Sequence, residues 1–278
     1  MFNSQDTIAH GQPKLSVSER HEQWMARHGR VYKDEAEKGK RLMIENLKFI
    51  ESINKAGNLS YKLGINEFAD ITSDEFFAKY TALNMPSSHP SPSPIPSTEF
   101  MINDLTDDEI PSNLDWRDNG VVTQVKHQGQ CALEGAYKLA TGQLLELSEQ
   151  ELLDCTNNNY GCNGGYMTNA FEFIIQNEGI STRSNYPYQG QQYTCRSQEQ
   201  TPAVQISGYQ VVPESETALL QAVTKQPVSL GISTSQEFQF FGGGTYHGSC
   251  ADRINHVVTA IGYGTDEQGQ KYWLLKNS

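Results

Sequence analysis

The sequence predicts an α+β protein in which a mostly helical segment precedes a larger domain of helices and strands. In the first segment, apolar residues recur at the spacing of a helix. Further along, candidate helices come first and β-type stretches come later, an order typical of α+β domains. With 278 residues, of which 37% are hydrophobic and 19% charged, the chain is long enough to bury a sizeable core.

The first segment is predicted to form two helices, a short extended stretch and a third helix. Apolar residues follow helical spacing over residues 18–27 and about 34–54. Residues 61–66 follow as an extended stretch, and Thr72 or Ser73 can then cap a small helix. These elements indicate a compact, charged, mostly α unit.

A linker rich in proline and serine follows at residues 84–100. Five of the chain's 11 prolines lie there, and such a run favours extended conformations over a packed core. It is also a favourable place for proteolytic cleavage. We therefore expect four parts: an unassigned leader at 1–16, a helical domain at 17–82, a linker at 83–110 and a second domain at 111–278.

The second domain is predicted to begin with helices. Ser148 and Glu151 have the spacing of a capping box, and this box opens a short helix that ends at Cys155. Two further helices are predicted at 167–176 and 216–225. The predicted strands are residues 228–233, 256–261 and 271–275.

Composition excludes several classes of function. Lys and Arg total 21 against 33 Asp and Glu, a formal net charge of −12, so nucleic acid is not an expected partner, because phosphate binding needs a basic face. No apolar run approaches the length of a membrane span. No cluster of His and Cys has ligand spacing, so we expect no metal and no organic cofactor.

The chain has five cysteines, at positions 131, 155, 162, 195 and 250. This clustering indicates disulfides formed in an oxidising compartment, and the odd number leaves one thiol without a partner. Residues 1–20 have neither a basic n-region nor an apolar h-region, so no signal peptide is expected there.

Three short motifs contain candidate functional residues, and each also has a purely structural interpretation. Cys131 follows the run Gln-Gly-Gln at 128–130 and precedes a helix. It is either a thiolate stabilised by the helix N-terminus or half of a disulfide. The pair Gly164-Gly165 lies in a tight turn, where it lets backbone approach a ligand or simply forms the turn. His256 opens an apolar strand and is either catalytic or structural.

Taken together, the motifs resemble those of the papain-like cysteine proteases of plant type, over roughly residues 18–278. The matching segments are DWR at 115–117, QGQC at 128–131, SEQELLDC at 148–155, GCNGG at 161–165, YPY at 186–188, NHVVTAIGYG at 255–264 and YWLLKNS at 272–278. The first domain resembles the inhibitory propeptide of that family at Glu37, Arg41, Asn46, Ile50 and Asn54 of a long helix, and at Gly64, Asn66, Phe68 and Asp70 after it.

The resemblance implies a two-lobed α+β fold, with a helical left lobe and a β-barrel-like right lobe, that hydrolyses peptide bonds with a Cys–His pair. It assigns His256 as the general base, Asn277 as the residue that orients the base and Gln128 as the oxyanion donor. The residues that match the family's substrate-binding positions are Gly164, Gly165, Tyr166 and Met167.

The resemblance also implies the disulfides and the partners. The implied disulfides are Cys131–Cys162 and Cys155–Cys195, with Cys250 free. The implied partners are peptide or protein substrates and, through the propeptide, related cysteine proteases, and the expected state is a monomer. The family's locations are the lysosome, the vacuole and the extracellular space.

The catalytic nucleophile does not match the family. There, the run Gln-Gly-x-Cys continues with Gly, a small residue, the catalytic Cys and Trp. Here Cys131 is followed at once by residues 132–135, which resemble the later part of that helix. The propeptide helix is two residues short between Arg41 and Asn46, which rotates its halves against each other by about 200°. The family also continues beyond Ser278, so we interpret the chain as truncated there.

Three interpretations follow from these departures. The first is a working thiol endopeptidase that uses Cys131 as a substitute nucleophile. The second is a non-catalytic homologue whose propeptide-like domain binds and inhibits related proteases. The third is a defective fragment, or a faulty gene model, of a protease with no activity of its own. We favour the last. The sequence therefore predicts a cysteine-type endopeptidase homologue that is catalytically defective because the nucleophile segment is missing after Cys131.

Overall fold

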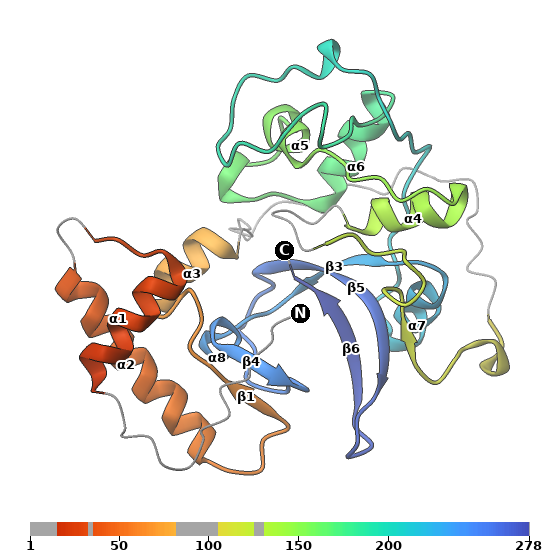
Figure 1. Cartoon of the computed structure of the whole chain (residues 1–278). Helices are drawn as coiled ribbons and strands as arrows, with labels where there is room; N and C mark the ends of the chain where they lie inside the picture. The colour runs from red at the N-terminus through yellow and green to blue at the C-terminus, as the bar shows by residue number, and fades with distance from the viewer. Residues whose placement is uncertain (1–15, 33–35, 82–104, 125–130, 278) are drawn as a thin grey trace. The chain divides into compact units, whose positions relative to one another are not determined.

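The structure, a computed structural model, describes residues 16–32, 36–81, 105–124 and 131–277 (Figure 1). The chain divides into two compact units. Unit 1 consists of Met1–Tyr80 and Ser233–Arg253, and unit 2 consists of Thr81–Ile232 and Ile254–Ser278. Unit 1 therefore combines the N-terminal segment with a stretch from the second half of the chain.

Unit 1 is mostly helical, as predicted. Its elements are α1 (Val17–His28), α2 (Ala36–Lys55), β1 (Tyr61–Leu63), α3 (Ser73–Tyr80), α8 (Gln236–Gln239) and β4 (Phe241–Gly244). α1 begins in a capping box between Ser16 and Glu19 and ends at Gly29, which has a left-handed φ of 60°. The Glu75 N–H donates to Thr72 Oγ1 at 3.1 Å, so Thr72 is the cap of α3.

The residues of the shortened propeptide motif in α2 differ in burial. The buried apolar residues of this helix are Leu42, Met43, Leu47 and Ile50. Asn46 is buried on the same face, whereas Arg41 is exposed. Five residues along a helix correspond to a rotation of about 140°. The motif residues on the two sides of the gap therefore lie on different faces of α2, in agreement with the sequence-based expectation.

Two asparagines of α2 hold the chain that follows the helix. Asn46 donates to Ala69 O at 2.9 Å and to Ile71 O at 3.0 Å. Asn54 donates to Leu63 O at 2.8 Å and accepts from Leu63 N at 2.9 Å. The amide of Asn54 thus takes the place of a neighbouring strand on one edge of β1.

The other edge of β1 pairs with β4, antiparallel, so that Tyr61 is opposite Gly244. Beside this pair, Asn66 Nδ2 donates to Gln239 O at 2.6 Å. The core beneath consists of Ile50, Tyr61, Leu63 and Phe240. The N-terminal segment therefore completes its core with residues from 233–253.

Unit 2 has a helical half and a sheet half, which gives the predicted α+β class. Its helices are η1 (Asp107–Glu109), α4 (Cys131–Thr141), α5 (Glu149–Cys155), η2 (Gly161–Asn163), α6 (Met167–Gln176), η3 (Ser197–Glu199) and α7 (Glu216–Lys225). Its strands are β2 (Leu114–Asp115), β3 (Val228–Ile232), β5 (His256–Thr265) and β6 (Lys271–Lys276). β5 is the central strand and pairs antiparallel with β2, β3 and β6.

Each half of unit 2 has its own core, and α4 contributes to both halves. The core of the helical half consists of Leu133, Leu147, Ile174, Ile180 and Val204. Val223 of α7 packs on Ala260 and Tyr263 of β5 in the sheet half. Cys131 shares a further buried cluster with Trp116 and Ile261. No helix in the described residues is long and apolar enough to cross a membrane.

The predicted capping box at α5 is only half formed. Ser148 Oγ accepts from Glu151 N at 3.0 Å, as predicted. The carboxylate of Glu151, however, accepts from Ser181 N at 2.8 Å and not from Ser148 N, because Ser148 N already donates to Ser181 O. The carboxylate therefore joins α5 to a distant loop.

One of the two predicted disulfides is present. Cys155 and Cys195 are bonded, and Cys250 carries no disulfide. The predicted Cys131–Cys162 bond is not formed, which corrects that expectation. Cys131 is buried as the first residue of α4, whereas Cys162 is exposed in η2. The shortened helix thus places the sulfur of Cys131 in the interior, away from its expected partner.

We expect Asn46→Ala to lower the free energy of unfolding of unit 1 by about 2–4 kcal/mol, because the buried carbonyl of Ala69 and the partly buried carbonyl of Ile71 lose their donor. Hydrogen-exchange mass spectrometry in urea, resolved to peptides of residues 36–80, measures the effect. Ser52→Ala is the matched control, since Ser52 Oγ makes an exposed bond to Phe49 O, and should cost less than about 0.5 kcal/mol. Equal effects of the two changes would contradict the role given to Asn46.

Candidate active site

Two of the predicted catalytic residues meet at one end of the sheet of unit 2. His256 is the first residue of β5 and is 6% exposed. Asn277 directly follows β6, the strand that pairs with β5. The strand pairing brings Asn277 Oδ1 to 2.6 Å from His256 Nε2.

This contact determines which nitrogen of His256 acts as a base. An amide oxygen can only accept a hydrogen bond, so Nε2 carries the proton in the contact with Asn277 Oδ1. The lone pair of the neutral ring is then on Nδ1, the atom that can take a proton from a nucleophile. Asn277 thus fixes both the tautomer and the plane of the ring.

Burial lowers the pKa of His256 below its usual value, and the hydrogen bond from its ring to Asn277 partly opposes that effect. Burial acts in this direction because a low-dielectric surrounding disfavours the charged imidazolium. The neutral ring is therefore the main form near pH 7. This is the form that a general base needs before reaction.

Cys131, the nearest match to a nucleophile, contacts a different residue of the same strand end. Its Sγ accepts a hydrogen bond from Lys276 Nζ at 3.2 Å. The same ammonium donates to Thr123 O at 2.9 Å and to Thr123 Oγ1 at 3.1 Å. Cys131 and Lys276 are both buried.

The strand geometry separates this contact from His256. Lys276 is the last residue of β6 and Asn277 directly follows it, so these two consecutive side chains point in different directions. The register agrees, because Lys276 pairs with Thr259, and Thr259 is an odd number of positions from His256. The structure therefore brings His256 and Asn277 together and places Cys131 on the other face.

The remaining predicted catalytic residue, Gln128, lies outside the described residues. The four substrate-binding candidates connect η2 to α6: Gly164 is the C-cap of η2, Tyr166 is the N-cap of α6 and Met167 begins it. Gly164 has a φ of 100°, which favours glycine. A Cβ on Gly165 would lie 2.1 Å from Asn159 Cγ, so that position also requires glycine.

Asn159 is a positioning residue that the motifs did not indicate. Its Oδ1 accepts from Tyr166 N at 2.9 Å and from Asn169 Nδ2 at 3.0 Å. It thereby holds the backbone at Gly165 and Tyr166 in place. Lys276 was also missed, although a lysine that ends an apolar strand directly before Asn277 is a signal that could have been noticed.

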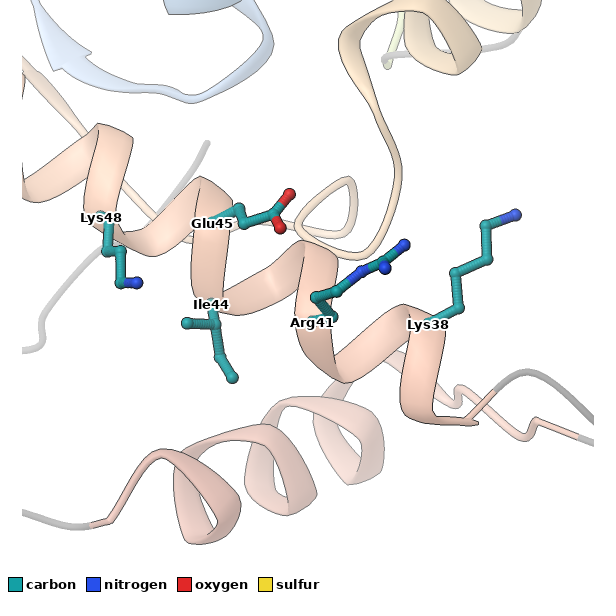
Figure 2. A pocket seen from close by; sticks show the side chains of 5 residues that line it. All are labelled: Lys38, Arg41, Ile44, Glu45 and Lys48. Carbon is teal, nitrogen blue, oxygen red and sulfur yellow. The ribbon is translucent and has the colours of Figure 1, made fainter.

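Two further features of the described residues concern metal and ligand binding. They contain no group of three or more His, Cys, Asp or Glu side chains that could hold a metal ion. A pocket in unit 1 is lined by one helix alone, as Figure 2 shows. Its residues are Lys38, Arg41, Ile44, Glu45 and Lys48. None of them is a predicted site residue.

Comparison with known proteins decides the family. Residues 110–278 match the papain family cysteine protease, and residues 21–76 match the cathepsin propeptide inhibitor domain (I29). The chain belongs to the papain family of cysteine proteases. It is 40% identical to fruit bromelain of Ananas comosus over 291 residues, covering 100% of this chain and 81% of that protein.

Further relatives agree with this assignment. The chain is 46% identical over 279 residues to the senescence-specific cysteine protease SAG39 of Oryza sativa subsp. indica, covering 95% of this chain and 80% of that protein. The solved structure of the recombinant stem bromelain precursor is similar with a TM-score of 0.82 and 37% identity, over 94% of this chain and 87% of that one. The proform of the ragweed pollen allergen Amb a 11 is similar with a TM-score of 0.80 and 34% identity, over 93% of this chain and 83% of that one.

We expect Asn277→Ala to lower the pKa of His256 further, because the change removes the hydrogen bond that raises it. NMR titration of the imidazole C–H signals measures the pKa. Asn113→Ala is the control, since Asn113 Oδ1 accepts from Thr265 N at the far end of β5 and should leave His256 unchanged. A rise in the pKa of His256 in Asn277→Ala would refute the assigned contact.

The lowered pKa of His256 also predicts a pH dependence of stability. The unfolded chain takes up the proton at a pH of about 6.5, above the pKa of the buried ring. The contribution of His256 is therefore fully present above about pH 6.5 and is lost as the pH falls toward the folded pKa. Urea unfolding at pH 7.5 and pH 5.5 should show a smaller loss of stability in His256→Gln than in the wild type.

Proposed function

We propose that this chain is a papain-family endopeptidase homologue that retains the general base and its orienting amide and does not hydrolyse peptides. The single observation that supports the proposal is the position of Cys131. Its sulfur accepts a hydrogen bond from Lys276, on the face of the sheet opposite to His256. Peptide hydrolysis by this family's chemistry requires a thiol in line with the base.

The retained residues fit their proposed roles. In a complete site, Nδ1 of His256 takes the proton of the thiol as the sulfur attacks the peptide carbonyl, and returns it to the leaving amine. Asn277 holds the ring in the tautomer that this step needs. Gln128 is the proposed donor to the developing oxyanion. Gly164, Gly165, Tyr166 and Met167 are the proposed substrate wall.

The other four cysteines offer no replacement. Cys155 and Cys195 are joined to each other. Cys162 is exposed in η2 and Cys250 is exposed in the segment after β4, in unit 1. None of the four directly precedes a helix of the sheet half, where a helix N-terminus would stabilise a thiolate.

The wider assignments follow from the family. We propose that residues 17–82 act as a propeptide, residues 83–110 as a cleavable linker and residues 111–278 as the peptidase domain. We propose a monomer, peptide or protein ligands at the substrate wall, and a location in the lysosome, the vacuole or the extracellular space.

A second function is supported by the intact contacts of the propeptide-like segment. β1 pairs with β4, and Asn66 binds Gln239, so the segment still docks on a stretch of the peptidase domain. We propose as the alternative that it docks in the same way on related proteases and inhibits them. The test is to titrate the full chain into an active plant relative. Inhibition that Asn66→Ala weakens supports this function, and no inhibition rejects it.

We expect the purified chain to show no peptide hydrolysis and no labelling by an epoxide that alkylates active-site thiolates, because loss of the nucleophile costs several powers of ten in rate. Insertion after Cys131 of the family's missing helix segment, with the catalytic Cys and Trp of its signature, should restore both. His256→Ala in the restored chain is the control and should abolish them again. Epoxide labelling of Cys131 in the unmodified chain, lost in His256→Ala, would overturn the proposal.

A further inference from the structure

A second cluster of reactive side chains lies in unit 2, on the face of the sheet opposite to His256. Lys276 Nζ and Cys131 Sγ are 3.2 Å apart, although the two residues are separated by 145 positions in the sequence. Cys131 is 5% exposed and Lys276 is 7% exposed. A nucleophilic nitrogen and a nucleophilic sulfur therefore meet in the interior, where α4 packs near β6.

The cluster includes a route along which the ammonium can lose a proton. Lys276 Nζ donates to Thr123 Oγ1 at 3.1 Å, and the Thr123 hydroxyl donates to Glu134 Oε2 at 2.5 Å. The other oxygen of Glu134 accepts from Leu147 N at 2.9 Å. A buried ammonium and a buried carboxylate are thus connected through one hydroxyl. Such a pair needs its hydrogen bonds because unpaired buried charges are costly.

We propose that Cys131 and Lys276 form a covalent N–O–S cross-link under oxidising conditions. The ammonium of Lys276 first gives one proton to Glu134 through the Thr123 hydroxyl. One N–H bond of the resulting amine and the S–H bond then break, and an N–O bond and an O–S bond form. The nitrogen and the sulfur each lose two electrons, and two molecules of hydrogen peroxide accept these four electrons. The four peroxide oxygens become the bridging oxygen and three water molecules.

The environment favours this product over the usual oxidation of a thiol. A thiol oxidised in water continues to sulfinic acid or combines with another thiol. At Cys131 the neighbour is the amine of Lys276, and burial limits access of other thiols. The exposed sulfurs of Cys162 and Cys250 have no such protection.

The cross-link would join α4 to β6 and close a long loop of the chain. A covalent closure of this length restricts the unfolded state strongly, so the melting temperature of unit 2 should rise by about 10 °C or more. A reductant such as dithiothreitol should remove the gain. The cross-link and the proposed function both rest on the contact of Cys131 with Lys276, but the cross-link does not use His256 and is detected by peptide mapping without any activity assay.

The test is peptide mapping of the full chain after treatment with hydrogen peroxide. Tryptic digestion without reductant should give a peptide pair that joins Cys131 to Lys276. The pair should carry one oxygen more and two hydrogens fewer than the separate peptides, and Lys276 should resist cleavage. Dithiothreitol should return the two peptides. A pair without the additional oxygen, or Cys131 found as sulfinic acid with normal cleavage at Lys276, overturns the proposal.

Two substitutions in β6 form a matched pair. Lys276→Arg keeps a cation beside the sulfur but cannot form the bridge, so the cross-linked peptide should disappear. Lys271→Arg, at the exposed start of the same strand, should leave its yield unchanged. Thr123→Val removes the hydroxyl between Lys276 and Glu134 and should slow the reaction. An unchanged rate in Thr123→Val overturns the role of the proton route, and a bridge that persists in Lys276→Arg overturns the assignment of Lys276.

Discussion

The alternation of side chains along β5 and β6 determines the chemistry available in unit 2. Asn277 and Lys276 are neighbours in the sequence, yet one contacts His256 and the other contacts Cys131. Strand pairing holds β5 against β6 through the register of Thr259 and Lys276. A side chain can change faces only if the pairing register of its strand slips by one residue. Such a slip would move every other side chain of that strand to the opposite face as well. The base and the sulfur are therefore separated by the sheet itself.

The short helix α4 shows how the fold tolerates this separation. Cys131 at its start packs with the sheet half of unit 2, and Leu133 packs with the helical half. In the same turn, the carboxylate of Glu134 accepts hydrogen bonds from the Thr123 hydroxyl and from the backbone N–H of Leu147. The first turn of α4 thus connects the two halves with both apolar and polar contacts. α4 therefore still joins the two halves of unit 2, although it places no thiol beside His256.

Features with a local signal could be predicted from the residues themselves, whereas contacts between distant segments could be predicted only where the family resemblance implied them, as for the Cys155–Cys195 disulfide. α6 and α7 begin and end at the predicted residues, because apolar spacing and caps act over a few positions. The contact of His256 with Asn277 was expected only because the resemblance to the family implied it. The place of Lys276 at the end of an apolar strand was a signal in the sequence, but its contacts with Thr123 and Cys131 depend on other elements and could not be predicted. The Cys131–Cys162 pairing was wrong because it assumed a helix of full length.

The pairing of β1 with β4 also has a consequence for the order in which the chain can fold during synthesis. Tyr61 finds its partner at Gly244, a residue made only after most of the chain has left the ribosome. The core around Ile50, Tyr61 and Phe240 therefore stays incomplete while much of unit 2 is being produced. Domains generally fold in order from the N-terminus, and loop closure over such distances is slow. The helical segment with α2 and β1 therefore cannot complete its core until Phe240 and Gly244 have also emerged.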